Sequence, residues 1–124
     1  NITDGNIVNI TVSFGIVVNP IYNRDFVLGN CLIALKNYFR VDNWQMGESI
    51  IISDISRSLM DVKGVDSVSN ISINNIYGTV NNSVYSDKVF DINGHLKNNI
   101  ITIEQDSIFE CRFPDINIEG GLLS

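Results

Sequence analysis

The chain has 124 residues and a formal net charge of −6, and 44% of its residues are hydrophobic while 18% are charged. This length and composition favour one folded domain with a hydrophobic core over a disordered segment. The eight basic residues are scattered, which argues against nucleic-acid binding, and no apolar run approaches the roughly 18 residues of a membrane span.

Residues 7–18 give the first predicted element, a β-strand. Apolar residues alternate with more polar ones from Val8 to Phe14, a pattern typical of a strand with one buried face. We expect the strand to continue past Gly15 or to bulge there. Asn19-Pro20 closes it.

An amphipathic helix is predicted from about Arg24 to Phe39, where the spacing of apolar residues changes to three and four. Asn23 precedes this segment and is the expected N-cap. We expect the helix to pack against the sheet. Its apolar stripe consists of Val27 or Leu28, Cys31, Leu32, Leu35, Tyr38 and Phe39.

A second helix is predicted after the short apolar run at residues 50–52. Ser53 is expected to cap this helix, and Asp54 lies where a negative charge interacts favourably with the helix dipole. Gly64 is expected to end it, in a position where a left-handed residue is usually needed. The predicted inner face consists of Ile55, Leu59 and Val62.

A further strand is predicted over residues 65–76. Val68 and the pair Ile71 and Ile73 differ in parity, so they cannot all lie on one face of a regular strand. We therefore expect a bulge or a register change between them.

Residues 77–99 are predicted to form a loop or hairpin insertion. The stretch from Gly78 to Ser86 is polar and rich in Asn and Ser, which favours an exposed loop. The dipeptide Asn93-Gly94 indicates a tight hairpin turn.

The last part of the chain is predicted to contain half-buried strands and a tail. Ile101 and Ile103 alternate with polar residues, and in residues 109–113 the apolar side chains share one face while Glu110 and Arg112 share the other. Residues 114–124 are expected to form an extended tail, either disordered alone or docked on a neighbouring protein.

Together these elements predict an α+β fold, with two helices packed on one face of a small, mostly antiparallel sheet. We expect a single domain over residues 1–124. The sequence begins Asn1-Ile2-Thr3 without an initiator Met, so we expect it to be a C-terminal fragment of a longer chain.

The residue types that carry nucleophilic catalysis are scarce. His95 is the only imidazole and follows the predicted turn, so we interpret it as a surface histidine and not as a catalytic base. Cys31 and Cys111 each fall in an apolar-periodic segment, where a reduced cysteine behaves as a small hydrophobe. The sequence therefore gives no catalytic residues, and an enzyme is not expected.

No metal or cofactor site is predicted either. A structural zinc site needs about four closely spaced Cys or His ligands, which the sequence does not contain. Residues 91–94 look superficially like part of a calcium loop, but Val89 and Ile100 would then occupy its first and last ligand positions, where acids are required. The glycine-rich phosphate-binding motifs are also absent.

The only tryptophan, Trp44, lies in a connecting segment together with Met46. Both side chains are candidates for an interface, because burying Trp and Met against a partner contributes strongly to binding. The alternative is that they cover the core of this domain. Removing both side chains would weaken assembly under the first interpretation and thermal stability under the second. Ile116 and Ile118 of the tail are the other interface candidates.

Two stretches of the sequence resemble parts of a known family. The first covers roughly residues 8–75 and is similar to the C-terminal domain of baseplate J-like proteins, the wedge subunits of contractile phage tails and related injection machines. The second covers residues 107–116 and looks like C-terminal segments of wedge proteins from T-even-like and marine phages. The long N-terminal part of such proteins has no counterpart here. The residues that carry the first resemblance are Tyr38, Phe39, Trp44, Met46-Gly47-Glu48, Ile50, Ser53, Ile55, Leu59, Val62, Gly64-Val65 and Val68.

The resemblance implies a strand, two helices and further strands that build the inner ring of a tail baseplate. It implies contacts with other baseplate and tail proteins, self-association, and a place in the virion after assembly in the host cytoplasm. It implies no catalytic residues and no cofactor. The alternative that the sequence leaves open is a small α+β ligand-binding or regulatory module without catalytic activity.

Overall fold

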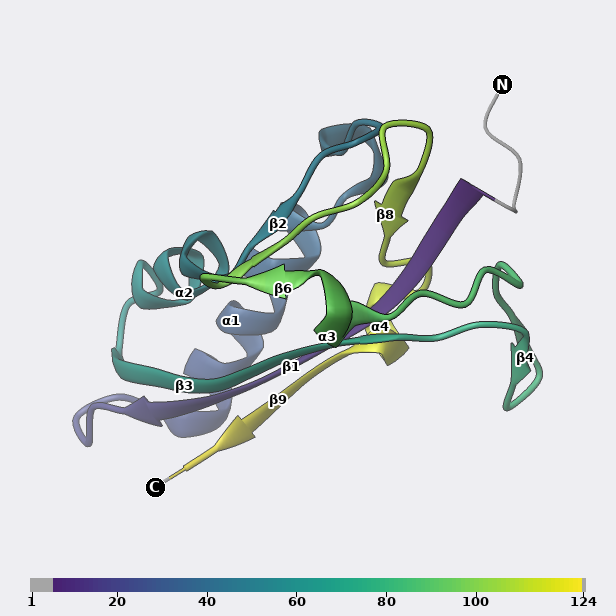
Figure 1. Cartoon of the computed structure of the whole chain (residues 1–124). Helices are drawn as coiled ribbons and strands as arrows, with labels where there is room; N and C mark the ends of the chain where they lie inside the picture. The colour runs from purple at the N-terminus through teal and green to yellow at the C-terminus, as the bar shows by residue number, and fades with distance from the viewer. Residues whose placement is uncertain (1–5, 124) are drawn as a thin grey trace.

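A computed structural model describes residues 6–123 of the chain. It contains helices and mixed sheets, which confirms the predicted α+β class (Figure 1). The elements are β1 (Ile7–Val18), α1 (Arg24–Tyr38), the 3-10 helix η2 (Val41–Asn43), β2 (Ile50–Ile51), α2 (Ile52–Met60), β3 (Val65–Asn75), β4 (Thr79–Val80), β5 (Ser83–Val84), α3 (Ile92–His95), β6 (Leu96–Lys97), β7 (Ile100–Ile101), β8 (Ile108–Glu110), α4 (Pro114–Asn117) and β9 (Ile118–Leu122).

Strand β1 is the centre of the main sheet. Strand β3 pairs antiparallel with one of its edges. On the other edge, β8 pairs in parallel with Ile7–Asn9 and β9 pairs in parallel with Val12–Ile16. The smaller sheets, β2-β7-β6 and β4-β5, are antiparallel throughout, so antiparallel pairings predominate, as the sequence predicts.

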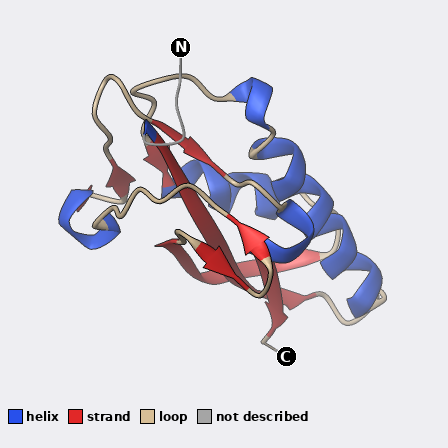
Figure 2. Ribbon diagram, turned by 90° about the vertical axis from the view of Figure 1, so that its right-hand side faces the viewer, coloured by secondary structure: helices blue, strands red, loops and turns tan. Residues whose placement is uncertain are grey.

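The two long helices cover one face of the main sheet (Figure 2). Helix α1 begins after Asn23, whose Oδ1 accepts a hydrogen bond of 2.8 Å from the N–H of Phe26, so the predicted N-cap is confirmed. The predicted stripe faces inward, with Val27, Cys31 and Leu35 buried against the apolar side of β1.

Helix α2 differs from the prediction at its start. It begins at Ile52 after Ile51, its first turn has no side-chain cap, and Ser53 is exposed. The prediction of a Ser53 cap is therefore wrong. The reason is tertiary: β2 pairs with β7, and the N–H of Ile52 donates to the carbonyl oxygen of Asn99 at 2.9 Å, which replaces a side-chain acceptor.

The inner face of α2 is as predicted, because Ile55 and Leu59 are fully buried. The helix ends at Met60, earlier than expected, and Gly64 lies in the turn that leads into β3. Gly64 has a φ of +99°, and a Cβ there would lie 2.8 Å from the side chain of Val27. Glycine is thus required at this position both by the backbone and by close packing.

The predicted bulge in β3 is confirmed. Asn70 has a φ of +57°, and the pairing of β3 with β1 shifts between Ser69 and Ser72. The extra residue belongs to β3, where two residues lie opposite Phe14. Strand β1 itself continues past Gly15, which is one of the two outcomes expected there.

The tight turns lie at Asn-Asn pairs rather than at Asn93-Gly94. Asn98-Asn99 connects β6 to β7, and Asn81-Asn82 connects β4 to β5, all four residues with positive φ. Such turns match the twist of hairpin strands, and asparagine tolerates them. Asn93-Gly94 lies instead inside α3, because Asp91 caps that helix by accepting a hydrogen bond from the N–H of Gly94 at 3.1 Å. The hairpin predicted at Asn93-Gly94 is therefore wrong.

The expected tail at residues 114–124 is part of the sheet as far as the structure describes it. After α4, strand β9 pairs with β1 from Ile118 onward, and only 4% of Ile118 is exposed. Ile116 remains 59% exposed. Ile118 is therefore a core residue and not an exposed interface side chain.

Trp44 also belongs to the core. Its ring is 8% exposed and stacks on Phe39 at a centroid distance of 5.6 Å. Its Nε1–H donates to the carbonyl oxygen of Tyr38 at 3.0 Å. Met46 is 42% exposed, so the two residues that the sequence grouped together have different environments.

We expect Trp44→Ala to lower the free energy of unfolding by about 3–5 kcal/mol, because it leaves a cavity beside Phe39 and removes a buried hydrogen bond. Met46→Ala is the matched control and is expected to cost less than about 1 kcal/mol, because its side chain is largely exposed. Urea denaturation followed by far-ultraviolet circular dichroism measures both. Equal, small losses would contradict the core assignment of Trp44.

Candidate protein-interaction arm

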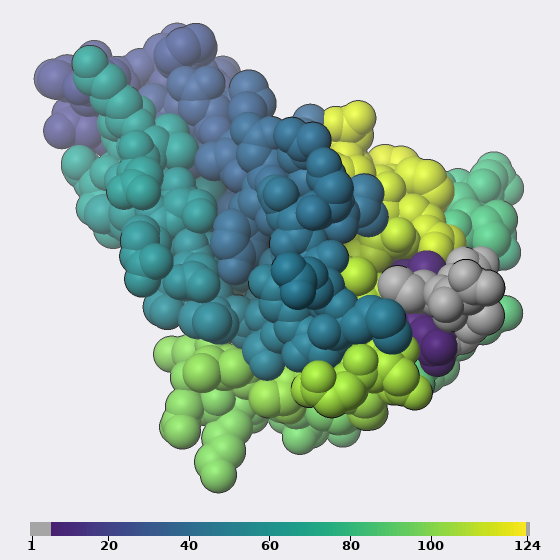
Figure 3. Space-filling view, turned by 90° about the horizontal axis from the view of Figure 1, so that it is seen from above, coloured from purple at the N-terminus to yellow at the C-terminus, as the bar shows by residue number. Residues whose placement is uncertain are grey.

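Residues 77–89 form an arm that protrudes from the body of the molecule (Figure 1, Figure 3). Strands β4 and β5 make its tip. Two backbone hydrogen bonds close its stem: Gly78 N–H donates to Ser86 O at 3.1 Å, and Tyr85 N–H donates to Gly78 O at 2.8 Å. The segment predicted as an exposed loop is thus a hairpin in which Tyr85 and Ser86 are buried.

Asn9, a buried polar residue on β1, fixes the arm to the sheet. Its Nδ2 donates to Glu110 Oε1 at 2.7 Å, and its Oδ1 accepts from the N–H of Ser86 at 2.7 Å. Its backbone carbonyl accepts from Asn75 Nδ2 at 2.9 Å. The side chain of Asn9 thereby connects the arm to β8, and its backbone carbonyl connects to β3.

Further polar contacts extend this anchor. Glu110 pairs with Arg112 at 2.7 Å, and Arg112 donates to the carbonyl oxygen of Val84 at 3.3 Å. Nδ2 of the buried Asn117 donates to the hydroxyl of Tyr85 at 2.9 Å. The sequence placed Glu110 and Arg112 on a common face, but it gave no signal for Asn9, because asparagine is frequent throughout the chain.

The arm carries exposed apolar side chains in spite of its firm attachment. Contacts within this domain do not bury them, and they lie on a hairpin whose position is fixed by hydrogen bonds. Exposed apolar groups on a rigid support are typical of a surface that contacts another protein. They are Tyr77, Val80, Val84 and Val89, which are 49%, 38%, 62% and 66% exposed.

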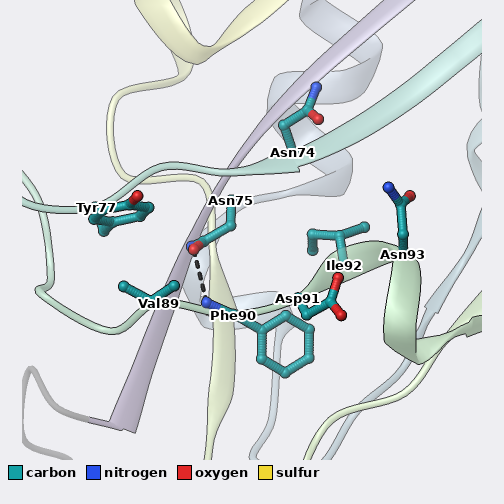
Figure 4. Close-up of a pocket in the computed structure, with 8 residues that line it drawn as sticks. All are labelled: Asn74, Asn75, Tyr77, Val89, Phe90, Asp91, Ile92 and Asn93. Carbon is teal, nitrogen blue, oxygen red and sulfur yellow. Dashed lines mark hydrogen bonds between the residues drawn. The ribbon is translucent and has the colours of Figure 1, made fainter.

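A hollow of about 210 Å³ lies at the base of the arm (Figure 4). Tyr77 and Val89 flank it on the arm side, and the N–H of Phe90 donates to Asn75 Oδ1 at 2.8 Å across its floor. This hydrogen bond fixes the end of the arm to β3. The lining residues are Asn74, Asn75, Tyr77, Val89, Phe90, Asp91, Ile92 and Asn93.

The residues with catalytic potential lie apart from this hollow or are engaged in packing. The ring of His95 stacks on Phe90 at 4.2 Å, and its Nδ1 lies 2.8 Å from the carbonyl oxygen of Asp91. Cys31 and Cys111 are free and buried. Within residues 6–123, no three His, Cys, Asp or Glu side chains are grouped so that they could hold a metal ion.

Burial controls the chemistry of both thiols. It raises the pKa of Cys31 to about 11, and burial together with the nearby Glu110 carboxylate raises the pKa of Cys111 to about 12. Both are therefore neutral thiols at physiological pH, which agrees with their interpretation as small apolar residues.

The chain matches no protein-family model and no curated protein sequence. Among the helices that the structure describes, none is long and apolar enough to cross a membrane.

We expect Asn9→Ala to lower the free energy of unfolding by about 2–3 kcal/mol, because it leaves the buried N–H of Ser86 without its acceptor. The amide of Ser86 should also exchange its hydrogen faster, which nuclear magnetic resonance detects. Asn74→Ala, at an exposed position on β3, is the control. Unchanged exchange at Ser86 would show that Asn9 does not hold the arm.

We expect iodoacetamide to label Cys31 and Cys111 slowly at pH 8 in the folded chain and rapidly in urea, because the native thiols stay protonated and buried. Since burial raises both folded-state pKa values above the 9.0 of an exposed thiol, the stability that the two thiols contribute is complete below about pH 9 and is lost as the pH rises towards 11–12. Mass spectrometry measures the labelling. Fast labelling of the native protein would contradict this environment.

Proposed function

We propose that this chain is a structural domain of a contractile-tail baseplate and acts through contacts with neighbouring protein subunits. The observation that carries the contact role is the arm, which is fixed to the body through Asn9 and exposes apolar side chains at Tyr77, Val84 and Val89. Burying these groups against a partner would remove their apolar surface from water, at about 25 cal/mol per Å². Because the arm is already ordered, little conformational entropy would be lost on binding.

The order of the elements supports the baseplate part of the proposal. Strand β1, helices α1 and α2 and strand β3 follow one another as expected for a baseplate J-like domain, a strand and two helices followed by further strands. Fold order alone does not identify a function, so this support is an analogy.

The two stretches that resemble the family meet in space. Gly47, in the hydrophobic-Gly-Glu turn, donates its N–H to the carbonyl oxygen of Ser107 at 2.8 Å. Gly47 has a φ of +76°, and a Cβ there would lie 2.7 Å from the side chain of Gln105. The positive φ therefore favours glycine at this turn, and the hydrogen bond to Ser107 connects the first stretch to the start of the second.

The proposed mechanism is geometric. Three hydrogen bonds hold the arm against the main sheet: Ser86 N–H donates to Asn9, Phe90 N–H donates to Asn75, and Arg112 donates to the carbonyl oxygen of Val84. A rigid element of this kind can serve in a ring of subunits, where contraction changes the interfaces between subunits rather than the fold of each one. The partners in this proposal are other baseplate and tail proteins and further copies of the same chain.

We expect Val84→Thr combined with Val89→Thr to reduce incorporation of the protein into tail particles about tenfold or more, because a 1.4 kcal/mol loss at an interface changes binding tenfold. Threonine keeps the shape and the strand preference of valine, so the melting temperature should stay the same. Quantitative mass spectrometry of purified particles measures the incorporation.

Val41→Thr is the matched control, because Val41 is 61% exposed and lies outside the arm. Absence of the protein from purified tail particles would contradict the baseplate role. Normal incorporation of the double variant would contradict the role of the arm. A purified chain that stays monomeric and is stabilised by a metabolite in a thermal-shift screen would favour the small ligand-binding module instead.

A further inference from the structure

Strand β9 is an outer strand of the main sheet, and no described strand pairs with its far edge (Figure 1). Leu123 donates its N–H to the carbonyl oxygen of Ile16 at 2.8 Å, so its backbone groups point towards β1. Successive residues of a strand point these groups in opposite directions. Gly120 and Leu122 therefore direct their N–H and C=O groups away from β1, and no residue in the described part of the chain bonds them.

Apart from the charge of Glu119, this edge lacks the features that usually protect a strand from pairing. It has no lysine, no proline and no bulge between Ile118 and Leu122. At Gly120 a Cβ would lie 2.5 Å from the ring of Phe14 and 2.7 Å from Leu28, so packing excludes a larger side chain. The result is an unobstructed row of backbone donors and acceptors.

Helix α1 provides an apolar surface beside this edge. Leu28 lies against Gly120, and one and two turns further along the same side of α1 come Leu32 and Lys36, the latter paired with Asp115 just before β9. Leu28 and Leu32 are both only partly buried. A strand added beyond β9 would place alternate side chains against these leucines, which favours apolar residues at those positions.

The charge at the edge indicates the partner. Glu119 is exposed on the open face of the sheet, and it forms no salt bridge with any cation in residues 6–123. Pairing β9 with β9 of a second copy would bring two such carboxylates close together, in a chain whose net charge is already −6. A strand that carries Lys or Arg opposite Glu119 is favoured instead.

We infer that the free edge of β9 binds an extended segment of a partner protein as an additional strand, with apolar residues towards α1 and basic residues towards Glu119. The backbone groups of Gly120 and Leu122 would supply the hydrogen bonds, and Leu28 and Leu32 would supply the apolar contact. This site is separate from the arm, and the inference does not depend on the baseplate role.

The test is a titration of the isotope-labelled chain with the synthetic peptide acetyl-Thr-Val-Lys-Val-Lys-Val-Thr-amide, followed by nuclear magnetic resonance. We expect saturable shifts centred on the amides of Gly120 and Leu122, and hydrogen exchange at these two amides slowed about tenfold at saturation, because pairing protects them. No change at either amide at millimolar peptide would overturn the inference.

Variants of the edge separate strand pairing from other binding. Leu122→Pro removes one outward N–H and leaves the bonds of Gly121 and Leu123 to β1, so it should abolish binding while the fold is retained, whereas Leu122→Val should bind normally. Glu119→Lys should weaken binding several-fold.

Equal binding by the two Leu122 variants would overturn strand addition. The peptide can also be tested in a form with N-methyl groups on alternate residues, which needs no change to the protein. If neither of the two alternate methylation patterns reduces binding, the inference fails. Shifts of Gly120 and Leu122 on concentrating the chain alone would assign the edge to a second copy and overturn the partner assignment.

Discussion

The structure depends on the backbone of β1, a buried strand whose N–H and C=O groups must find partners on both edges. Strand β3 satisfies one edge, and β8 and β9 share the other. Between these two strands the chain leaves the edge through α4. Asn9 is the last β1 residue that pairs with β8, and its side chain reaches both Glu110 and Ser86. Because β8 pairs with β1 only as far as Asn9, the arm is attached at the point where the pairing of β1 with β8 ends.

Asparagine serves three physical purposes in this chain, all of them structural. As an N-cap, Asn23 accepts a hydrogen bond from the first turn of α1. In the hairpin turns, Asn81-Asn82 and Asn98-Asn99 adopt the positive φ values that few other residues tolerate. In the interior, the amide of Asn9 donates and accepts at once, so one side chain can satisfy two buried groups. The asparagine-rich composition therefore contributes to the formation and the rigidity of the fold.

Two separate surfaces are proposed here as contact surfaces, the apolar arm and the free edge of β9. They use different chemistry: the arm offers side chains such as Val84, and the edge offers backbone groups of Gly120 and Leu122. A domain with two independent contact surfaces can bind two neighbours at once, as an element of a closed ring must. In the proposed assembly role, the arm and the edge of β9 would each contact a different neighbour.

Local periodicity in the sequence determined the α+β class, helix α1, the central strand β1 and the bulge in β3. Burial of one face gives apolar residues a period of two in a strand and a spacing of three and four in a helix. The tertiary structure alone decided which residues of the connecting and terminal segments are buried. Trp44 stacks in the core although it lies in a loop, and Ile118 is buried because β1 has an edge to fill. Asn9 became the anchor of the arm through partners 77 and 101 positions away. Such contacts leave no local pattern, since they depend on which distant segments the sheet brings together.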